Sequence, residues 1–430
     1  MDLKPTKPLS GFIELTPVQQ RCFDECATRM QKVLRNAGFS HLDLPAIERA
    51  EVLTDKDNWD EIETQMFLFQ KGDTKMGLRY DGTVGLSRYV AGHMNDLVFP
   101  FRAYQFARNY RGERPQRGRY REFYQMDLDI MGINSLSTNY DAEIVATLSR
   151  VYESVAEFIG PTYVRVGNRK FWNAMFDFLD LDDVKRRSAF VLIDKKDKLK
   201  DFEEGLVEEL GAGAAAEINR VFTEGYRSFV GKTEDLDSAI VELDGFMELL
   251  NAMGVKNAQI DLGIMRGHAY YTGVVFEFFL KDFPELGAIG GGGRYEDLAS
   301  KFSKTKIIGV GAAVGFSRLM VALLEENKID LTKFEKPIDV AVLVMGANQV
   351  VYSMSVLGAL RDANIASVAY LDADKKFKNQ IEYADKINAK YAIIIGDTEV
   401  ENNVVALKNM VTGEQQSVTV VDAIKIIMGC

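Results

Sequence analysis

The sequence contains few cysteines, histidines and prolines for its length: 3, 3 and 9 among 430 residues. Cys22 and Cys26 stand one helical turn apart and Cys430 is the final residue, a spacing that suits neither a disulfide framework nor a zinc site. The histidines are scattered along the chain at His41, His93 and His268. We therefore expect no disulfide framework and no metal held by protein side chains, and this cysteine usage is typical of a reducing compartment.

Long apolar runs are also missing. No stretch reaches the roughly 18 uninterrupted apolar residues that a membrane span requires. The opening residues, MDLKPTKPLSG, contain no basic stretch that leads into an apolar run. We therefore expect a cytoplasmic protein with no membrane partner. The formal net charge of -11 disfavours a nucleic-acid partner at long range, although local basic clusters can override it.

The chain has enough apolar residues, 47% of the total, for two or three hydrophobic cores. Residues 16–39 carry apolar side chains at helical spacing and close near Gly38, which predicts an amphipathic helix. The segment around Pro45 predicts an extended strand at a sheet edge or an interface, because proline interrupts a central ladder.

The next part of the chain predicts a sheet domain that carries a helical insertion. Apolar and polar residues alternate over 66–79 and again over 99–111, which predicts antiparallel strands of a half-buried sheet. Residues 141–158 return to helical spacing. The charged stretch of about 170–257 is strongly helical, and strand-like residues resume at Ala258, so we expect the stretch to be an insertion on the sheet domain.

The C-terminal part has a different sequence pattern. A predicted helix over 316–326 runs into a polar, proline-punctuated segment at 326–336, which we interpret as a linker. After it, strand-like runs alternate with helices predicted over 350–363 and 376–387. The alternation predicts a small α/β domain with a largely buried sheet over 337–430.

The densest chemical signal is an arginine-rich hairpin at residues 101–132, which holds seven arginines. A solvated face of a basic hairpin is the simplest interpretation of that composition. However, Arg111 and Glu113 lie two apart at the end of one strand, and Phe123 and Gln125 have the same spacing on the returning strand. Residues two apart share a face of a strand, so this face would offer a fixed cation, an acceptor for an amino group and an aromatic plane.

The hairpin string FARNYRGERPQRGRYREFYQMDLDIMG resembles the second class-defining motif of class II aminoacyl-tRNA synthetases, and specifically that of the histidyl family. The resemblance implies that Arg111 holds the α-phosphate of ATP and the substrate carboxylate. It implies that Glu113 meets the edge of the adenine and that Phe123 stacks on its ring. Gln125 and Asp129 would line the histidine pocket.

A second string, RGHAYYTGVVFE, contains a lone arginine and a tyrosine pair. Such a pair is by itself more often core or rim than a site. The string resembles the histidine-specific signature of the same family, usually RGLDYYTG, with His268 and Ala269 as departures. The resemblance implies that Arg266 contacts the reacting phosphate and carboxylate and that Tyr270 and Tyr271 contact histidine.

The string LRYDGTVGLSRY resembles the segment that binds the substrate's α-ammonium group in this family, with Asp81, Gly82 and Thr83 in the binding positions. In isolation, an aspartate at such a place is ordinarily a turn former.

A glycine run precedes a further signature, GGGRYEDL. Its glycines suit a phosphate cradle or, more commonly, a tight turn, and a P-loop is excluded because no Gly-Lys-Ser/Thr follows. The string resembles the second histidyl signature, which implies that Arg294 and Tyr295 lie at the substrate pocket.

The string GVGAAVGFSRLM imitates a dinucleotide-binding turn and so raises the alternative of a nicotinamide-dependent oxidoreductase. That alternative is weak, because no second strand with an acidic end follows and the helix runs into a linker at Asp330. The string better resembles the third class II motif, which implies that Arg318 lies over the adenine and near the γ-phosphate. Ser317 stands where the family commonly has glutamate.

The resemblance covers nearly the whole chain and implies an α+β fold. We expect a class II catalytic domain over residues 1–325, built on an antiparallel sheet with its helical insertion at about 170–257. A linker at 326–336 would join it to an α/β domain at 337–430, which resembles the anticodon-binding domain of related class II enzymes. The helix at 16–39 and the strand around Pro45 match the first class II motif, which forms the subunit interface, so we also expect a homodimer.

The implied reaction is activation of L-histidine by ATP, a substrate here, followed by transfer to tRNA(His). Magnesium would bind mainly through the ATP phosphates. Since the attacking carboxylate is already charged, no protein nucleophile is needed, and Arg111, Arg266 and Arg318 would supply positive charge where phosphate charge develops. The alternative from another class is a non-catalytic, synthetase-like regulatory or histidine-sensing subunit.

Overall fold

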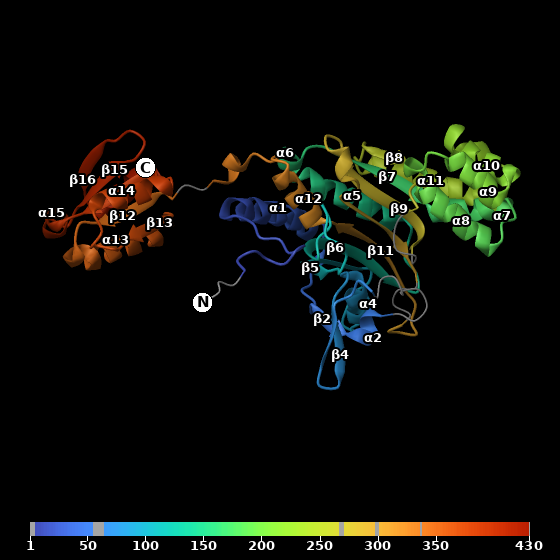
Figure 1. Ribbon diagram of the computed structural model, residues 1–430, viewed down its shortest axis with the longest axis horizontal. Helices are drawn as coiled ribbons and strands as arrows, with labels where there is room; N and C mark the ends of the chain where they lie inside the picture. Colours follow the sequence, from blue (N-terminus) through green and yellow to red (C-terminus); the bar gives the residue numbers. More distant parts are fainter. Residues whose placement is uncertain (1–4, 55–63, 266–270, 297–300, 336–337, 430) are drawn as a thin grey trace. The chain divides into compact units, whose positions relative to one another are not determined.

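The structure is a computed structural model that describes residues 5–54, 64–265, 271–296, 301–335 and 338–429. The chain divides into two compact units, Met1–Leu331 and Thr332–Cys430 (Figure 1). None of the described helices is both long enough and apolar enough to cross a membrane.

The first unit is built on a mainly antiparallel sheet. Its described strands follow one another across the sheet in the order β1 (Ser40–His41), β5 (Phe101–Tyr110), β6 (Glu122–Ile133), β11 (Ile307–Val314), β10 (Gly290–Tyr295), β9 (Tyr271–Leu280), β7 (Thr162–Asn168) and β8 (Ala258–Ile260). The outer pairs β1/β5 and β7/β8 are parallel, and the pairs between them are antiparallel. The predicted antiparallel sheet is thus confirmed. Because β11 runs antiparallel to both of its neighbours, the GVGAAVG string does not belong to a parallel βαβ unit, and the oxidoreductase alternative is excluded.

One face of this sheet is covered by the helices α1 (Pro17–Asn36), α5 (Asn139–Glu153) and α12 (Phe316–Glu325), and the short helix α6 (Ala156–Ile159) follows α5. Of these, α5 packs against β6, β7 and β11, α12 packs against β6, and α1 packs against α5. Met126, Leu128 and Ile130 of β6 are completely buried. Successive side chains of a strand point to opposite faces, so the polar residues between these three face away from the helices.

A small sheet borders the large one. Its strands are β2 (Ile47–Arg49), β4 (Thr74–Leu78) and β3 (Leu68–Lys71), and the nearby helices are α2 (Ala50–Leu53) and α4 (Thr83–Gly92). The edge strand predicted around Pro45 is confirmed in its placement but not in its continuity, since the chain forms two short edge strands, β1 and β2, on either side of Pro45, which belongs to neither. Proline has no N–H to donate to a ladder, which accounts for the break.

The predicted helical stretch is confirmed between β7 and β8. It contains α7 (Arg169–Phe178), α8 (Asp183–Asp194), η1 (Lys196–Lys198), α9 (Phe202–Leu210), α10 (Ala212–Thr223), η2 (Tyr226–Phe229) and α11 (Glu234–Ala252). The side chains of Asn168, Asp182 and Thr233 accept hydrogen bonds from backbone N–H groups at the starts of α7, α8 and α11. Helix α7 packs against β9 and α11 against α5, whereas α8 and α10 both pack against α9. Two further short turns are η3 (Pro284–Leu286) and η4 (Leu331–Phe334).

The second unit has a mixed sheet in the order β13 (Ser367–Tyr370), β12 (Val340–Val344), β14 (Tyr391–Ile395), β15 (Val405–Asn409) and β16 (Gln415–Val418). Its helices are η5 (Ala347–Gln349), α13 (Val350–Asp362), α14 (Phe377–Lys386), α15 (Asp397–Glu401) and α16 (Val420–Met428). The first three strands are parallel and every residue of β12 is buried, because α13 and α16 contribute to the core on one face and α14 to the core on the other. The predicted α/β unit with a buried sheet is confirmed, and the antiparallel strands β15 and β16 extend it.

Candidate active site

Two adjoining cavities lie on the first unit, one of about 420 Å³ and one of about 40 Å³. Gln125, Tyr271 and Ala313 line both, so the cavities form one continuous site. We call them the large cavity and the small cavity. The principal side chains of the large cavity come from the β5–β6 hairpin, β9 and α12: Arg111, Glu113, Arg119, Tyr120, Phe123, Phe276, Glu277 and Arg318.

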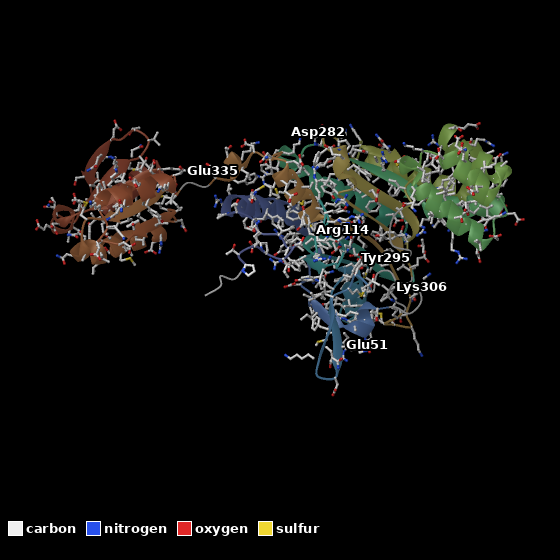
Figure 2. The ribbon with its side chains drawn as sticks, viewed as in Figure 1. Glu51, Arg114, Asp282, Tyr295, Lys306 and Glu335 are labelled. Atoms are coloured by element: carbon white, nitrogen blue, oxygen red, sulfur yellow. The ribbon has the colours of Figure 1, made fainter. Side chains whose placement is uncertain are left out.

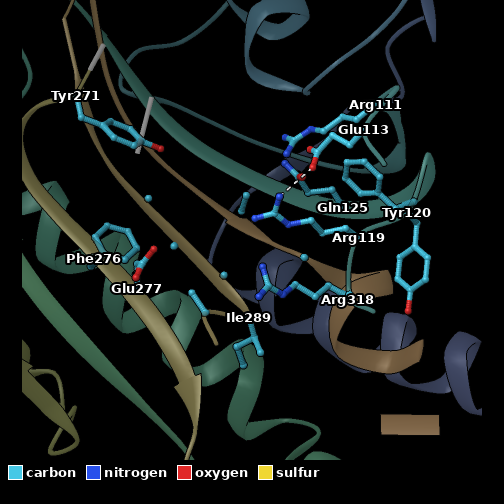
Figure 3. Close-up of a pocket in the computed structure, with 18 residues that line it drawn as sticks. Arg111, Glu113, Arg119, Tyr120, Gln125, Tyr271, Phe276, Glu277, Ile289 and Arg318 are labelled. Carbon is cyan, nitrogen blue, oxygen red and sulfur yellow. Dashed lines mark hydrogen bonds and ion pairs between the residues drawn. The ribbon is translucent and has the colours of Figure 1, made fainter. Parts of the chain in front are cut away.

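The large cavity gathers positive charge. Figure 3 shows Arg111, Arg119 and Arg318 pointing toward one open space, with Glu277 on the opposite wall. Nη1 of Arg119 lies 3.3 Å from Oε2 of Glu113, while Nη2 of Arg318 donates a 2.5 Å hydrogen bond to the carbonyl of Leu286. Three guanidinium groups around one space suit a polyphosphate.

Arg111 is held between two aromatic rings. Its Cζ lies 4.4 Å from the centroid of the Tyr80 ring and 5.2 Å from that of Phe123. Its Nε donates a 3.4 Å hydrogen bond to the carbonyl oxygen of Tyr80. The rings restrict the guanidinium to one place without neutralising it, so Arg111 keeps its charge for an anion.

Arg318 is positioned by the packing of α12. Oγ of the neighbouring Ser317 accepts a 2.8 Å hydrogen bond from the backbone N–H of Tyr124 on β6. On the other side, the ring of Phe316 packs edge-on against Phe23 and Phe106, with centroids 4.6 and 5.1 Å away. The serine that departs from the family pattern therefore links α12 to the sheet.

The glycine run forms strand β10, the floor of the large cavity, rather than the turn or phosphate-cradling loop that the sequence suggested. A Cβ on Gly292 would overlap the carbonyl oxygen of Gly311, and one on Gly290 would overlap the Tyr152 hydroxyl. Glycine is needed here because neighbouring groups occupy the space of a side chain.

Arg294 is not at the substrate pocket, and that expectation is wrong. Its Nη2 lies 2.8 Å from Oδ1 of Asp141, and the two side chains are only 4% and 1% exposed. It also donates to the carbonyls of Leu136 and Ser137. Since neighbouring strand residues point to opposite faces, Tyr295 faces the small cavity instead, and Figure 2 locates it within the first unit.

The small cavity is lined by carboxylates. The Tyr295 hydroxyl donates a 2.8 Å hydrogen bond to Asp129, and Nε2 of Gln125 donates a 2.5 Å bond to Asp127. Burial raises the pKa of Asp129 to about 8 and that of Asp127 to about 7. Such carboxyl groups take up or lose a proton near neutral pH, as groups at functional sites often do.

The turn at Asp81, Gly82 and Thr83 closes the small cavity. Oδ1 of Asp81 accepts a 3.0 Å hydrogen bond from the backbone N–H of Val84 at the start of α4, while its buried Oδ2 has no hydrogen-bond partner among the described residues. A Cβ on Gly82 would lie 2.5 Å from Oδ2 of Asp127, so only glycine fits against this carboxylate. The orphaned oxygen suits a cationic group of a ligand.

Most of the sequence-predicted residues that the structure describes are brought together at the two cavities; Arg294 is the exception, and Gly82 packs behind the small cavity against Asp127. Arg111, Glu113, Phe123 and Arg318 line the large cavity, Asp81, Thr83, Asp129 and Tyr295 line the small one, and Gln125 and Tyr271 line both. Arg266, His268, Ala269 and Tyr270 lie outside the described residues. Sequence reasoning missed Asp127, Arg119 and Glu277. The signal for Asp127 was present, because it shares the two-residue spacing of Gln125 and Asp129.

Comparison with known proteins agrees with this geometry. A family model described as histidyl-tRNA synthetase matches residues 11–323, and one described as an anticodon binding domain matches residues 339–428. The chain is 37% identical to the histidine–tRNA ligase of Clostridium tetani over 99% of both chains, and 37% identical to that of Finegoldia magna over 95% of this chain and 96% of that one. A crystal structure of histidyl-tRNA synthetase from a Nostoc species matches with a TM-score of 0.84 and 28% identity over 100% of both chains. The chain belongs to the histidyl-tRNA synthetase family.

Proposed function

We propose that the chain activates L-histidine with ATP to give histidyl-adenylate and transfers the histidyl group to the 3′ end of tRNA(His). One observation carries this proposal: an arginine-lined cavity and a carboxylate-lined cavity share Gln125 and Tyr271. A polyphosphate in the first and an amino acid in the second would meet at that junction, which is where the bond must form.

The first step is attack of the histidine carboxylate on the α-phosphorus of ATP, with pyrophosphate leaving. The carboxylate is already a nucleophile, so the protein has to position the reactants and stabilise developing negative charge. Arg111 and Arg318 line the large cavity and would supply positive charge at that position. The family places Arg266 there too, and we carry this role over as part of the proposal.

The remaining roles divide between the cavities. Glu113 and Phe123 would meet the adenine. Asp81, Gly82 and Thr83 would hold the α-ammonium group. The other residues proposed to contact histidine are Gln125, Asp129, Tyr270, Tyr271 and Tyr295.

Magnesium would accompany ATP, mainly on its phosphate oxygens. The donor set fits this mode, because Glu113 and Glu277 line the large cavity and no group of three or more acidic, histidine or cysteine side chains among the described residues could hold a metal ion. When bound, the ion adds positive charge against the phosphates.

The deciding experiment is histidine-dependent ATP–pyrophosphate exchange by the purified chain, followed by charging of tRNA(His). Exchange with histidine and not with other amino acids supports the proposal. A chain that binds histidine without exchange would instead be a regulatory or histidine-sensing subunit. That alternative is not favoured, because the arginines of the large cavity and an anticodon-binding domain are both present.

We also propose that the protein works as a homodimer in the cytoplasm. Support comes from α1 and the β1–β2 segment, which match the first class II motif. An obligate interface of this kind buries more than about 2,000 Å². Sedimentation of the active protein would show a dimer, whereas a fully active monomer would contradict the assignment.

A further inference from the structure

The described residues of the small cavity carry an excess of negative charge. Asp81, Asp127 and Asp129 line it, and each is at most 5% exposed. No lysine, arginine or histidine is among the described residues that line it. Buried carboxylates without a cation beside them are unfavourable, so the cavity is complementary to a positively charged ligand.

Asp127 has no role in the proposed function, although it lies between two residues that have one. Asp81 would meet the α-ammonium group of histidine, and Asp129 would meet the ring. Because Oδ2 of Asp127 lies 2.5 Å from where a Cβ of Gly82 would be, Asp127 packs against the turn that follows Asp81. It therefore lies at the ammonium end of the small cavity.

Asp127 also fixes the direction of the Gln125 amide. Nε2 of Gln125 donates a 2.5 Å hydrogen bond to Oδ1 of Asp127. The amide oxygen is then the polar atom that Gln125 has left for a ligand, and an oxygen is an acceptor that suits an ammonium group.

The charged and polar groups around Asp127 come from several elements. Arg79 is turned toward backbone, since it donates to the carbonyls of Arg108 and Leu44 at 2.7 and 2.9 Å. Strand β11 contributes the uncharged Ala313 opposite Asp127. The groups are Arg79 after β4, Asp81 before α4, Gln105 on β5, Arg111 after β5, and Gln125 and Asp129 on β6.

We propose that Asp127 is a second counter-charge for the α-ammonium group of the substrate, beside Asp81, and that it orients the Gln125 oxygen toward the same group. This inference rests on the proposed function, because it takes the small cavity to hold an amino acid. It makes Asp127 a determinant of specificity for an ammonium group over a neutral group of similar size.

The test compares L-histidine with imidazole-lactate, in which a hydroxyl replaces the ammonium group. Calorimetric titration gives the ratio of the two dissociation constants for the wild type, for Asp127→Asn and for Asp141→Asn. The first variant should lower the preference for histidine about tenfold or more, because a charge-assisted hydrogen bond is lost. Asp141 is a matched control, since it is equally buried but pairs with Arg294 outside both cavities. Its variant should keep the wild-type ratio.

A measurement on the wild type keeps the test independent of how the variants fold. Since burial and the neighbouring Asp81 raise the pKa of Asp127 to about 7, the carboxyl group ionises between pH 6 and pH 8. The preference for histidine over imidazole-lactate should therefore grow about tenfold across that range. Asp129 titrates with both ligands, but the ring of imidazole-lactate takes up a proton at a higher pH than the ring of histidine, because it lacks the neighbouring ammonium charge. Each dissociation constant is therefore corrected for the protonated fraction of the free ligand, measured separately, before the ratio is taken.

The outcomes are separable. Wild-type protein that binds no histidine would contradict the proposed function itself. Wild-type protein that binds histidine, with a ratio that neither pH nor Asp127→Asn changes, would overturn the role of Asp127 and leave the function standing.

Discussion

The hydroxyl of Tyr295 on β10 donates a 2.8 Å hydrogen bond to Oδ1 of Asp129 on β6, across the intervening strand β11. Two glycines of β11 make this contact possible. A Cβ on Gly309 would overlap the Tyr295 ring, and one on Gly311 would overlap the Asp129 carboxylate. The glycines that imitate a dinucleotide-binding turn in the sequence therefore make room for a tyrosine–aspartate pair in the small cavity.

Asp129→Asn should weaken the binding of histidine and leave the binding of ATP nearly unchanged. Asparagine keeps the size but cannot ionise, so the carboxylate that would accept from histidine's ring N–H is lost and an amide donor is introduced beside it. Losing one partner of a buried charged hydrogen bond costs about 2–5 kcal/mol, so KM for histidine in pyrophosphate exchange should rise tens-fold or more. Tyr295→Phe is the companion variant, and it should have a smaller effect because it leaves the carboxylate. An unchanged KM in Asp129→Asn would show that Asp129 has a structural role and does not contact histidine.

The same substitution should change how stability depends on pH. Burial raises the pKa of Asp129 to about 8 in the folded protein, whereas an unfolded aspartate titrates near 4. Between these values the folded state holds a proton that the unfolded state has lost, so this group's contribution to stability falls as pH rises, by at most about 1.4 kcal/mol per pH unit. Asparagine does not titrate. Urea titrations from pH 5 to pH 8 without ligands should therefore show Asp129→Asn gaining stability relative to the wild type, and a constant difference would contradict the raised pKa.

Gly311→Ala should damage the small cavity, because the new Cβ would occupy the place of the Asp129 carboxylate. KM for histidine should rise, and overpacking of this kind typically costs about 1–3 kcal/mol of stability. Gly213→Ala is the matched control, since Gly213 lies in α10 with open space around its Cβ position. That variant should be as stable as the wild type or up to about 1 kcal/mol more stable, with unchanged kinetics. Equal behaviour of the two variants in the exchange assay would rule out the close-packing argument.

The residues of the small cavity show what the sequence could and could not predict. Two-residue spacing on a strand correctly placed Phe123 and Gln125 on one face of β6, because side-chain direction along a strand follows from local geometry. The family resemblance added Asp129, which lies on the same face. The same reasoning places Asp127 on that face too. However, the local sequence does not predict that the Asp127 carboxylate will be buried against Gly82. Burial depends on strands that pair from distant parts of the chain.

Arg294 is a residue whose position could not be predicted from a sequence motif. It adjoins Tyr295 in a family signature, but its partner Asp141 lies far away in the sequence, at the start of α5. No local pattern connects these two residues. The glycine run before Arg294 was misjudged for the same reason, because the atoms that exclude its side chains belong to Tyr152 and β11.

Arg294→Met should destabilise the first unit without changing histidine recognition. Removing one partner of a buried ion pair leaves an uncompensated charge and costs about 3–5 kcal/mol. Asp141→Leu in the Arg294→Met background should recover part of that loss, because neither charge then remains buried. Thermal or urea unfolding gives the stabilities, and exchange kinetics on the folded fraction give KM for histidine. A large rise in KM at unchanged stability would instead put Arg294 at the substrate.

A chain that ends at Leu331 should keep adenylate formation and lose efficient tRNA charging. Every residue assigned to the two cavities lies between Asp81 and Arg318, inside the first unit. The second unit has its own core on both faces of its sheet, and the described core beside the site is built from residues of the first unit. If the second unit binds the anticodon, the truncated chain loses one of two linked contacts with the tRNA, and kcat/KM for tRNA should fall about 10²-fold or more. Exchange kinetics with histidine and ATP should stay close to wild type. The full-length chain measured in parallel is the control, and a truncated chain that charged tRNA as well as the full chain would show that the second unit does not read the tRNA.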